Sequence, residues 1–323
     1  MLFKQSLGLC LGLILLCAQL HAQSITTAQQ LLEKEQYTQA QQELEQILEK
    51  EPDAQEAQLL LGQAHCHQSQ FDKAIKVLKP LRSTMKTRAD LYYWLGQSYK
   101  GKLLATENFL EKGVLSSKVK EYLEKAIDLD PKHADARESI AFFYFSAPGI
   151  VGGSKKKAFQ QVEAIKPLDA RRSYILAGNL YRQNKDYPAA IAAYQALAEM
   201  EPEEANWPFL LGFCYQMTPD YKQAFISFEQ AIGLDDKKAG AYYQFARTGV
   251  LSKQRTNQCI GYMQYFLKLN DSKSYPRASA YWRLGMLYEI KGEKGKARAA
   301  YDQGLALDPK DEKLLKASKA LKE

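Results

Sequence analysis

The sequence predicts an all-α protein that folds as a solenoid of paired antiparallel helices. Segments of one pattern recur along it, as in YLEKAIDLDP, YQALAEMEP, FEQAIGLDD and YDQGLALDP. A second pattern precedes them, as in YYWLGQSY, YILAGNLY, PFLLGFCY and YWRLGMLY. Small residues recur at a spacing of 34, as in Gly62 and Gly96 or Gly178 and Gly212. We therefore expect a quasi-one-dimensional stack in which each repeat contacts only its neighbours.

These segments resemble the tetratricopeptide repeat, whose pattern is W-x2-L-G-x2-Y, then A-x3-F, then P. The resemblance covers nearly the whole chain after residue 22 and implies a right-handed superhelix of about eight antiparallel helix pairs. The expected repeats are 21–54, 55–88, 89–133, 134–170, 171–204, 205–238, 239–272 and 278–311, followed by a capping helix over 312–323.

Each recurring residue type has a physical reason. Gly or Ala at the eighth position of a unit and Ala at the twentieth, such as Ala190, let two helices approach closely. Aromatic residues at later positions, such as Tyr194, then fill the space between them. Proline near the end of a unit, such as Pro202, has no N–H to continue a helix and so separates the units.

Residues 1–22 differ from the rest of the chain. Lys4 precedes the apolar segment LGLCLGLILLCAQL, and the small residue Ala22 stands before Gln23. This pattern indicates a secretory signal peptide, with an uncleaved anchor as the alternative. No later segment is long and apolar enough to span a membrane, and the expected location is the bacterial periplasm.

Composition adds two points. The chain has 46% hydrophobic and 25% charged residues, which is ordinary for a globular protein, and its net charge is +7. Three cysteines follow residue 22, namely Cys66, Cys214 and Cys259. An odd number in distant segments disfavours a disulfide framework.

Two repeats are longer than the others. From Gly96 to Pro131 is 35 residues against 24 from Gly178 to Pro202, and the 11 extra residues are close to three helical turns. They are expected to lengthen both helices of the third repeat into a hairpin that turns at Gly113. The fourth repeat has about five extra residues in SAPGIVGGSKKKA, and its loop is expected beside the hairpin. A similar PGI-V-GG loop occurs in the exported bacterial repeat proteins that this chain resembles.

The loop has the glycines and lysines of a phosphate-binding loop but lacks the Gly-Lys-Ser/Thr sequence. A phosphate-binding loop also follows a strand, whereas a helix is expected before this one, so a nucleotide site is disfavoured. Ser154 is a good N-cap and places three lysines in the first turn of the next helix, where they oppose the helix dipole. A solvated run of charge is the first interpretation. The hypothesis set beside it is an edge that binds an anionic envelope component, with Lys112, Lys118 and Lys120 of the hairpin nearby. Its residues are Gly152, Gly153, Ser154, Lys155, Lys156 and Lys157.

No metal, cofactor or catalytic site is expected. His65, Cys66 and His67 are adjacent on an expected helix, so they point about 100° apart and cannot meet at one ion. The sequence contains no HExxH, G-x-S-x-G, EF-hand or CxxC motif. These observations disfavour an enzyme.

The resemblance implies a binding surface on the concave side of the repeats. Rigid aromatic rings with arginine and amide groups are typical of recognition surfaces, although packing between repeats is the alternative for these aromatics. The expected residues are Tyr93, Trp94, Gln97, Phe142, Phe145, Asn179, Arg182, Phe209, Phe213, Tyr243, Arg247, Trp282 and Arg283, with Gln63 and Gln216 among them.

The expected function is an exported, non-enzymatic scaffold that binds a protein segment in this groove. The alternative is a ligand-binding subunit of an envelope transport or polysaccharide system. A nucleic-acid partner is not expected outside the cytoplasm.

Overall fold

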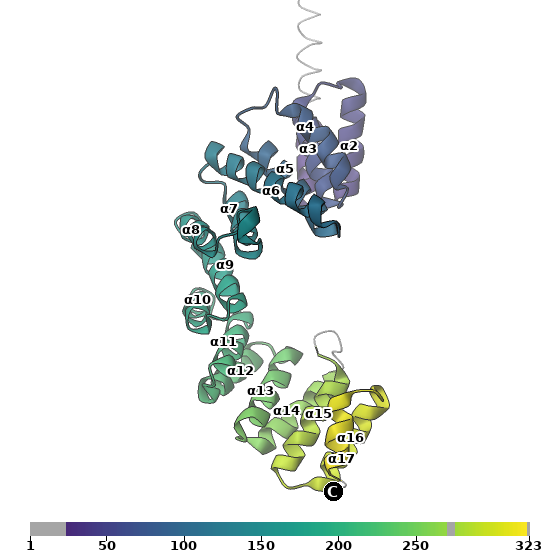
Figure 1. Cartoon of the computed structure of the whole chain (residues 1–323), viewed down its shortest axis with the longest axis vertical. Coiled ribbons are helices and arrows are strands. Elements are labelled where there is room, and N and C mark those ends of the chain that lie inside the picture. The colour runs from purple at the N-terminus through teal and green to yellow at the C-terminus, as the bar shows by residue number, and fades with distance from the viewer. Residues whose placement is uncertain (1–23, 270–274, 322–323) are drawn as a thin grey trace, which may run out of the picture. The chain divides into compact units, whose positions relative to one another are not determined.

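The computed structural model describes residues 24–269 and 275–321 (Figure 1). Within these ranges the chain is helical and contains no strand, as the sequence predicts. Residues 24–33 form the first described helix. The expected signal peptide, residues 1–22, lies outside the described residues.

The remaining elements follow in order along the chain (Figure 1). They are α2 (Tyr37–Lys50), α3 (Gln55–His67), α4 (Phe71–Leu81), α5 (Ala89–Ala105), α6 (Phe109–Leu129), α7 (Ala134–Ser146), the 3₁₀ turn η1 (Gly149–Val151), α8 (Lys155–Ile165), α9 (Ala170–Gln183), α10 (Tyr187–Met200), α11 (Asn206–Met217), α12 (Tyr221–Leu234), α13 (Ala239–Ser252), α14 (Thr256–Leu269), α15 (Arg277–Ile290), α16 (Lys294–Leu307) and α17 (Glu312–Ala320).

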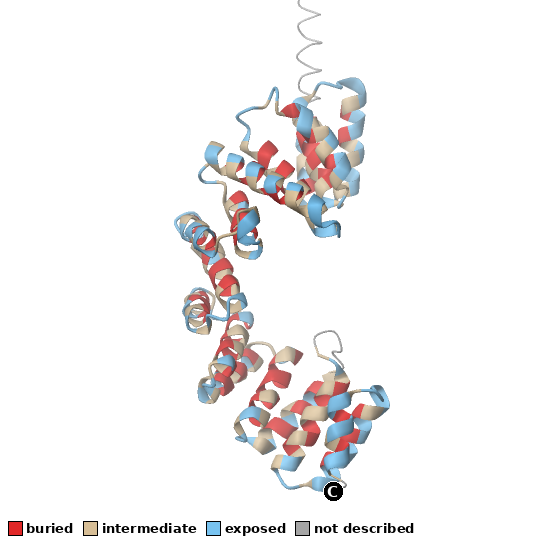
Figure 2. Ribbon diagram, viewed as in Figure 1, coloured by how far each residue is buried: buried red, intermediate tan, exposed pale blue. Residues whose placement is uncertain are grey.

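The chain divides into two compact units, Met1–Ala170 and Arg171–Glu323, each with its own packing. In both units each helix packs mainly against the next one along the chain, as in α3 with α4 and α15 with α16. Figure 2 shows buried and exposed positions alternating along the helices of each unit. Among the described residues no helix is long and apolar enough to cross a membrane.

Small residues in the first helix of a pair allow the second helix to pack closely. In the second unit a Cβ atom on Gly178 would overlap the ring of Tyr194, and Gly285 has the same relation to Tyr301. In the first unit the side chain of Leu78 takes the place of that ring against Gly62. The small residue and the large one are therefore parts of a single contact, repeated along the chain.

The pair α13–α14 has a close contact between other residues. Here the close approach is between Gly249 and Cys259, because a Cβ on Gly249 would overlap the Cys259 sulfur. Cys259 stands one position after Gln258, which replaces the alanine expected at that point. Gly249 and the small thiol of Cys259 therefore let these two helices approach closely.

The hairpin α5–α6 is lengthened in both helices, as predicted, with 17 and 21 residues. The predicted turn at Gly113 is wrong: the chain turns between Ala105 and Phe109, and Gly113 lies inside α6. Asn108 is the reason, because its side-chain oxygen accepts hydrogen bonds from the backbone N–H groups of Leu110 and Glu111 and starts the helix there.

Candidate functional site

The first unit contains an open hollow of about 450 Å³, which we call the acidic hollow. Leu32, Leu59 and Leu60 contribute buried apolar surface to it. Its other lining residues come from the helix of residues 24–33, from α3, and from the start of α5 and α7: Gln29, Glu33, Glu56, Gln63, Arg88, Asp90, Tyr93, Trp94, His133 and Asp135. The first helices of four successive pairs therefore share one site.

Three of its carboxylates stand at the same place in three successive repeats. Glu56, Asp90 and Asp135 each lie in the first turn of a helix, namely α3, α5 and α7. Negative charge there is favoured by the positive end of the helix dipole. The stacking of the repeats brings these helix starts to one side of the unit, so the carboxylates line the same hollow.

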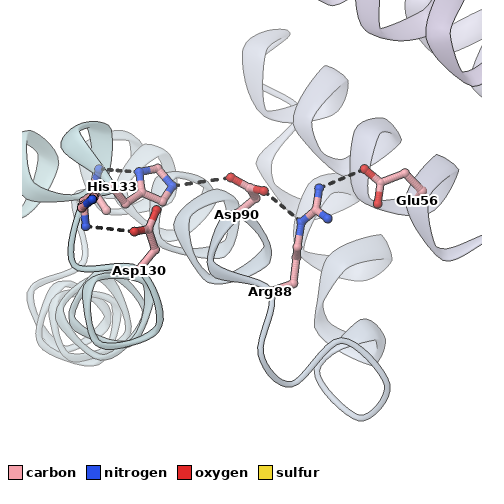
Figure 3. Close-up of polar contacts among 7 residues, drawn as sticks. Glu56, Arg88, Asp90, Asp130 and His133 are labelled. Carbon is pink, nitrogen blue, oxygen red and sulfur yellow. Dashed lines mark hydrogen bonds and ion pairs between the residues drawn. The ribbon is translucent and has the colours of Figure 1, made fainter.

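Arg88 links two of these carboxylates (Figure 3). Its guanidinium group lies 3.1 Å from an oxygen of Glu56 and 2.9 Å from an oxygen of Asp90. The other oxygen of Asp90 lies 3.7 Å from Nε2 of His133. One line of polar groups thus joins α3, the start of α5 and the start of α7.

His133 is the N-cap of α7 and is held in one orientation. Its Nδ1 atom accepts a hydrogen bond from the backbone N–H of Ala136, which places the proton of the neutral ring on Nε2. Asp130 accepts from the backbone N–H of Lys132 and forms the turn before it. The His133 side chain is 8% exposed, and its Nε2 atom has no hydrogen-bond partner. A buried donor without an acceptor is uncommon.

Tyr93 and Trp94 form the aromatic part of the hollow. Their ring centroids are 4.8 Å apart, and the Tyr93 ring lies 4.8 Å from that of His133. On its other side Trp94 lies 5.0 Å from His67. Both aromatic side chains remain partly exposed, so their rings combine packing between repeats with accessible surface.

The other predicted groove residues of the first unit lie outside the lining of the hollow. Gln97 donates a hydrogen bond to Ser139 on α7. Phe142 is 39% exposed. Phe145 is partly buried, its ring in edge contact with Phe159 on α8.

Around α9 and α11 of the second unit, the predicted groove residues contact one another through Tyr194. The Tyr194 hydroxyl donates to Asn179 at 3.1 Å and accepts from Nε of Arg182 at 3.3 Å. The Arg182 guanidinium also lies over the Phe213 ring, 5.9 Å from its centroid. These contacts join the pair α9–α10 to α11.

Farther along, the predicted residues are more deeply buried. Tyr243 is 3% exposed and stacks on Tyr275 with 3.9 Å between ring centroids. Arg283 lies over the Tyr243 ring, and burial lowers the pKa of its guanidinium. The Tyr243 ring therefore packs between α13, the segment before α15, and α15 itself, and offers little free surface.

Arg247 donates to Gln216, with 2.6 Å between Nη1 and Oε1. Gln216 is buried and donates in turn to the hydroxyl of Thr248 at 2.8 Å. Phe209 packs against Phe228, with 6.0 Å between centroids. These side chains contribute polar and aromatic contacts between α11, α12 and α13.

Trp282 lies near two cations, Arg283 at 5.1 Å and Lys313 of α17 at 5.3 Å from its ring. It also packs against the small cluster that closes the C-terminal end of the second unit.

Comparison with family models gives three matches, each described as tetratricopeptide repeat, over residues 31–97, 175–239 and 278–311. The chain is a tetratricopeptide repeat (TPR) protein. No curated protein matches the TPR chain in the sequence comparison.

The fold is that of a solved TPR structure. The C-terminal part of a TPR repeat-containing protein from Cytophaga hutchinsonii has a TM-score of 0.62 at 17% identity, covering 80% of this chain and 98% of its own. YrrB, described as a TPR protein with an unusual peptide-binding site, has a TM-score of 0.49 at 19% identity, covering 61% and 97%. A chain of the APC/C hetero-tetramer Cut9–Hcn1 has a TM-score of 0.48 at 16% identity, covering 89% of this chain and 53% of that one. The TPR chain thus spans about half the length of that last relative.

The glycine loop of the TPR chain has a helix on both sides, α7 and α8, as the sequence predicts. Gly152 has a φ of +95°, and Gly153 has no room for a side chain beside the carbonyl of Ala147. Ser154 caps α8 by accepting from the backbone N–H of Lys157. The N–H groups of residues 151–154 all donate to carbonyl oxygens within the chain, so this backbone does not form the open cradle of a phosphate-binding loop.

The loop lies against the middle of α6. The side chain of Lys120 approaches Gly152, and a second hollow of about 760 Å³ includes both residues. Arg82, Lys120 and Lys125 line it together with three acids, so its charge is balanced. Lys155, Lys156 and Lys157 are all exposed, and Nζ of Lys157 lies 5.4 Å from the Tyr144 ring centroid. Binding of an anion here stays a prediction.

The described residues contain no group of three or more His, Cys, Asp or Glu side chains that could hold a metal ion. Cys66, Cys214 and Cys259 are free thiols. Burial raises the pKa of Cys214 to about 11 and that of Cys259 to about 12.

The sequence pattern placed Tyr93, Trp94 and Gln63 in the groove but did not identify the acids around them. The signal was present: Glu56, Asp90 and Asp135 occupy the second position of three successive repeats. Charge repeated at one position of a solenoid collects on one face, because successive units stack in the same orientation.

Proposed function

We propose that this TPR protein is a non-enzymatic interaction scaffold whose first unit binds an extended segment of a partner polypeptide in the acidic hollow. The observation that carries the proposal is the hollow itself, which four successive repeats line. TPR arrays and other solenoids use their concave faces for binding, which supports this choice of surface.

The arrangement of the hollow suits a peptide better than a small molecule. Its apolar residues come from different helices, Leu32 before α2 and Leu59 and Leu60 on α3, and it is open rather than enclosed. Tyr93 and Trp94 add large rings that lose little conformational entropy on binding. A segment that crosses the helices can contact the apolar, aromatic and polar residues in turn.

The test is selection of binders from a display library of random peptides on the immobilised wild-type chain. Peptides that are enriched should lose about 2 kcal/mol of binding free energy to the Trp94→Ala variant, because a central aromatic anchor contributes on that scale. Tyr265→Ala is the matched control, since Tyr265 is 38% exposed on α14 of the second unit. Absence of enriched peptides, or equal binding to both variants, contradicts the proposal.

Export is part of the proposal and rests on the pattern of residues 1–22. Cleavage after Ala22 would deliver the chain to the periplasm. Intact-mass measurement of the protein from a periplasmic fraction should then give a chain that begins at Gln23. Recovery of the chain from membranes with Met1 retained contradicts it.

A further inference from the structure

We infer that the end of the α5–α6 hairpin is a contact surface for a second copy of this chain. Four large apolar side chains lie there in solvent, and we call them the apolar tip: Leu104, Phe109, Leu110 and Val114. They are 64% to 85% exposed. A group of large exposed apolar side chains on a folded chain marks a surface that has a partner. None of them lines the acidic hollow, so the inference is independent of the proposed function.

The α6 part of the apolar tip lies on the side of the helix that faces away from the core. Leu115 and Val119, on the inner side, are buried. At about 100° per residue, Gly113 and Ser117 fall between the exposed apolar side chains on the outer side. Both are small, and no atom lies within 4 Å of a Cβ added to Gly113. A second helix can therefore approach this side of α6 closely.

The hollow of about 760 Å³ continues the same side of α6 toward its C-terminal end. Ser117, which lies beside the apolar tip, also lines this hollow, as do Lys120 and Glu121 one turn farther on. The opposite wall is the glycine loop, where Ile150 is 95% exposed. The surface thus has a projecting part and a hollow part, which lie roughly 16 Å apart along the helix.

A projection and a hollow displaced along one helix face fit a second copy of the same face. When two α6 helices lie antiparallel about a two-fold axis, the apolar tip of each copy enters the hollow of the other, and the contact closes on itself. Ile150 then gives the entering tip an apolar wall.

Charge supports the same arrangement. With the axis between Gly113 and Val114, positions 107 and 120 lie equally far from it on either side. Glu107 of one copy then faces Lys120 of the other, and the symmetry forms the same pair a second time.

Glu107 and Lys120 are free to make this exchange, because their present ion pairs are long. Glu107 is 97% exposed, with Nζ of Lys112 at 3.6 Å, and Nζ of Lys120 lies 4.0 Å from Glu124. Exposed pairs of this kind contribute little to stability. Glu124 keeps the hydrogen bond that it accepts from the Tyr144 hydroxyl.

The size of the surface suits a dimer. Four side chains of this exposure present roughly 500 Å² of apolar surface on each copy. The polar lining of the hollow surrounds it, and about 800 Å² on each partner makes a specific interface. A lipid surface fits less well, because the exposed carboxylates of Glu107 and Glu111 would enter the bilayer together with the apolar tip.

The experiment measures the mass of the chain from Gln23, which keeps every described residue, by sedimentation equilibrium from micromolar to near-millimolar concentration. We expect a monomer–dimer equilibrium. Leu110→Asp should raise its dissociation constant at least about a hundredfold, because each dimer loses two buried leucines. Leu168→Asp is the matched control, at an exposed leucine of the first unit outside this surface, and should leave the constant unchanged.

A second measurement tests the two-fold arrangement itself. Glu107→Lys sets two lysines against each other at both symmetric contacts, and Lys120→Glu sets two acids against each other, so each variant alone should dimerise about tenfold more weakly. A mixture of the two variants restores both attractive pairs and should form a heterodimer with the affinity of the wild type. Circular dichroism checks that both variants are folded.

A wild-type chain that stays monomeric throughout overturns the inference. So does a Leu110→Asp variant that dimerises as the wild type does, since the dimer then forms through another surface. A mixture of Glu107→Lys and Lys120→Glu chains that associates no better than either alone also overturns it. Flotation of monomeric wild type, but not Leu110→Asp, with phospholipid vesicles assigns the apolar tip to lipid instead.

Discussion

The Cα atom of Gly153 lies so close to the carbonyl oxygen of Ala147 that a Cβ atom on Gly153 would overlap it. This contact folds the glycine loop back onto the end of α7 and places Ser154 where its backbone N–H donates to the carbonyl of Tyr144 at 2.7 Å. The loop between α7 and α8 is therefore a closed structure rather than a loose connection.

We expect Gly153→Ala to lower the free energy of unfolding of the first unit by at least about 2 kcal/mol, because the loop must open to admit the methyl group. The control is Gly113→Ala inside α6, where no atom lies within 4 Å of an added Cβ. That change should stabilise the helix by about 0.5 to 1 kcal/mol. Urea denaturation followed by circular dichroism measures both; equal midpoints for the two variants contradict the closed loop.

Gln216 is the centre of a buried polar network in the second unit. Its side chain donates to Thr248 and to the carbonyl of Gln244 and accepts from Arg247. Gln216→Leu should lower the free energy of unfolding by about 2 to 3 kcal/mol, since it leaves buried polar groups without partners. Gln230→Leu, on the exposed surface of α12, is the control and should change stability little. Thermal melts of the two variants that coincide would show that the network contributes nothing.

The buried thiols should make the protein less stable at high pH. Burial holds the pKa of Cys214 at about 11 and that of Cys259 at about 12 against an ordinary value of 9.0. Above pH 9 the unfolded chain releases these protons and the folded chain keeps them, so stability falls as pH rises, by up to about 1.4 kcal/mol for each unit of pKa difference.

Denaturation by urea at pH 8 and pH 10 tests this loss of stability. A Cys214→Ala/Cys259→Ala variant should lose less stability between the two pH values than the wild type does.

The three cysteines should also differ in their reactivity. In native protein with Cys10 and Cys17 replaced by serine, a thiol reagent should modify Cys66 before Cys214 and Cys259, which are 0% exposed. Equal rates at all three thiols would contradict the packing of α11 and α14.

The three exposed lysines at the start of α8 should contribute to binding of anionic surfaces. Lys155→Glu/Lys156→Glu/Lys157→Glu reverses their charge without touching the core, so binding to vesicles that contain an anionic phospholipid should fall at low salt. The control is Lys222→Glu/Lys268→Glu/Lys294→Glu, which makes the same change of charge at exposed positions of the second unit. If both variants bind as the wild type does, the glycine loop serves only as a connection.

The sequence by itself determined the repeat architecture, because close packing of two helices needs a small residue and a large one at fixed spacing, and both are visible in pairs such as Gly178 and Tyr194. It also determined the N-cap at Ser154 and the lengthening of both α5 and α6. It misplaced the turn of that hairpin, since Gly113 is the stronger turn residue in isolation and the capping of α6 by Asn108 depends on which hydrogen bonds form.

Only the tertiary structure decided what the groove residues do. Tyr93 and Tyr243 occupy the same position of their repeats, yet one lines a hollow and the other is buried against Tyr275. Tyr275, which covers Tyr243, lies after the repeat that contains Tyr243. The repeat pattern carries no information about that later segment. The acidic hollow likewise exists only when Glu33, Asp90 and Asp135 from separate repeats meet, because stacking brings side chains far apart in the chain to one face.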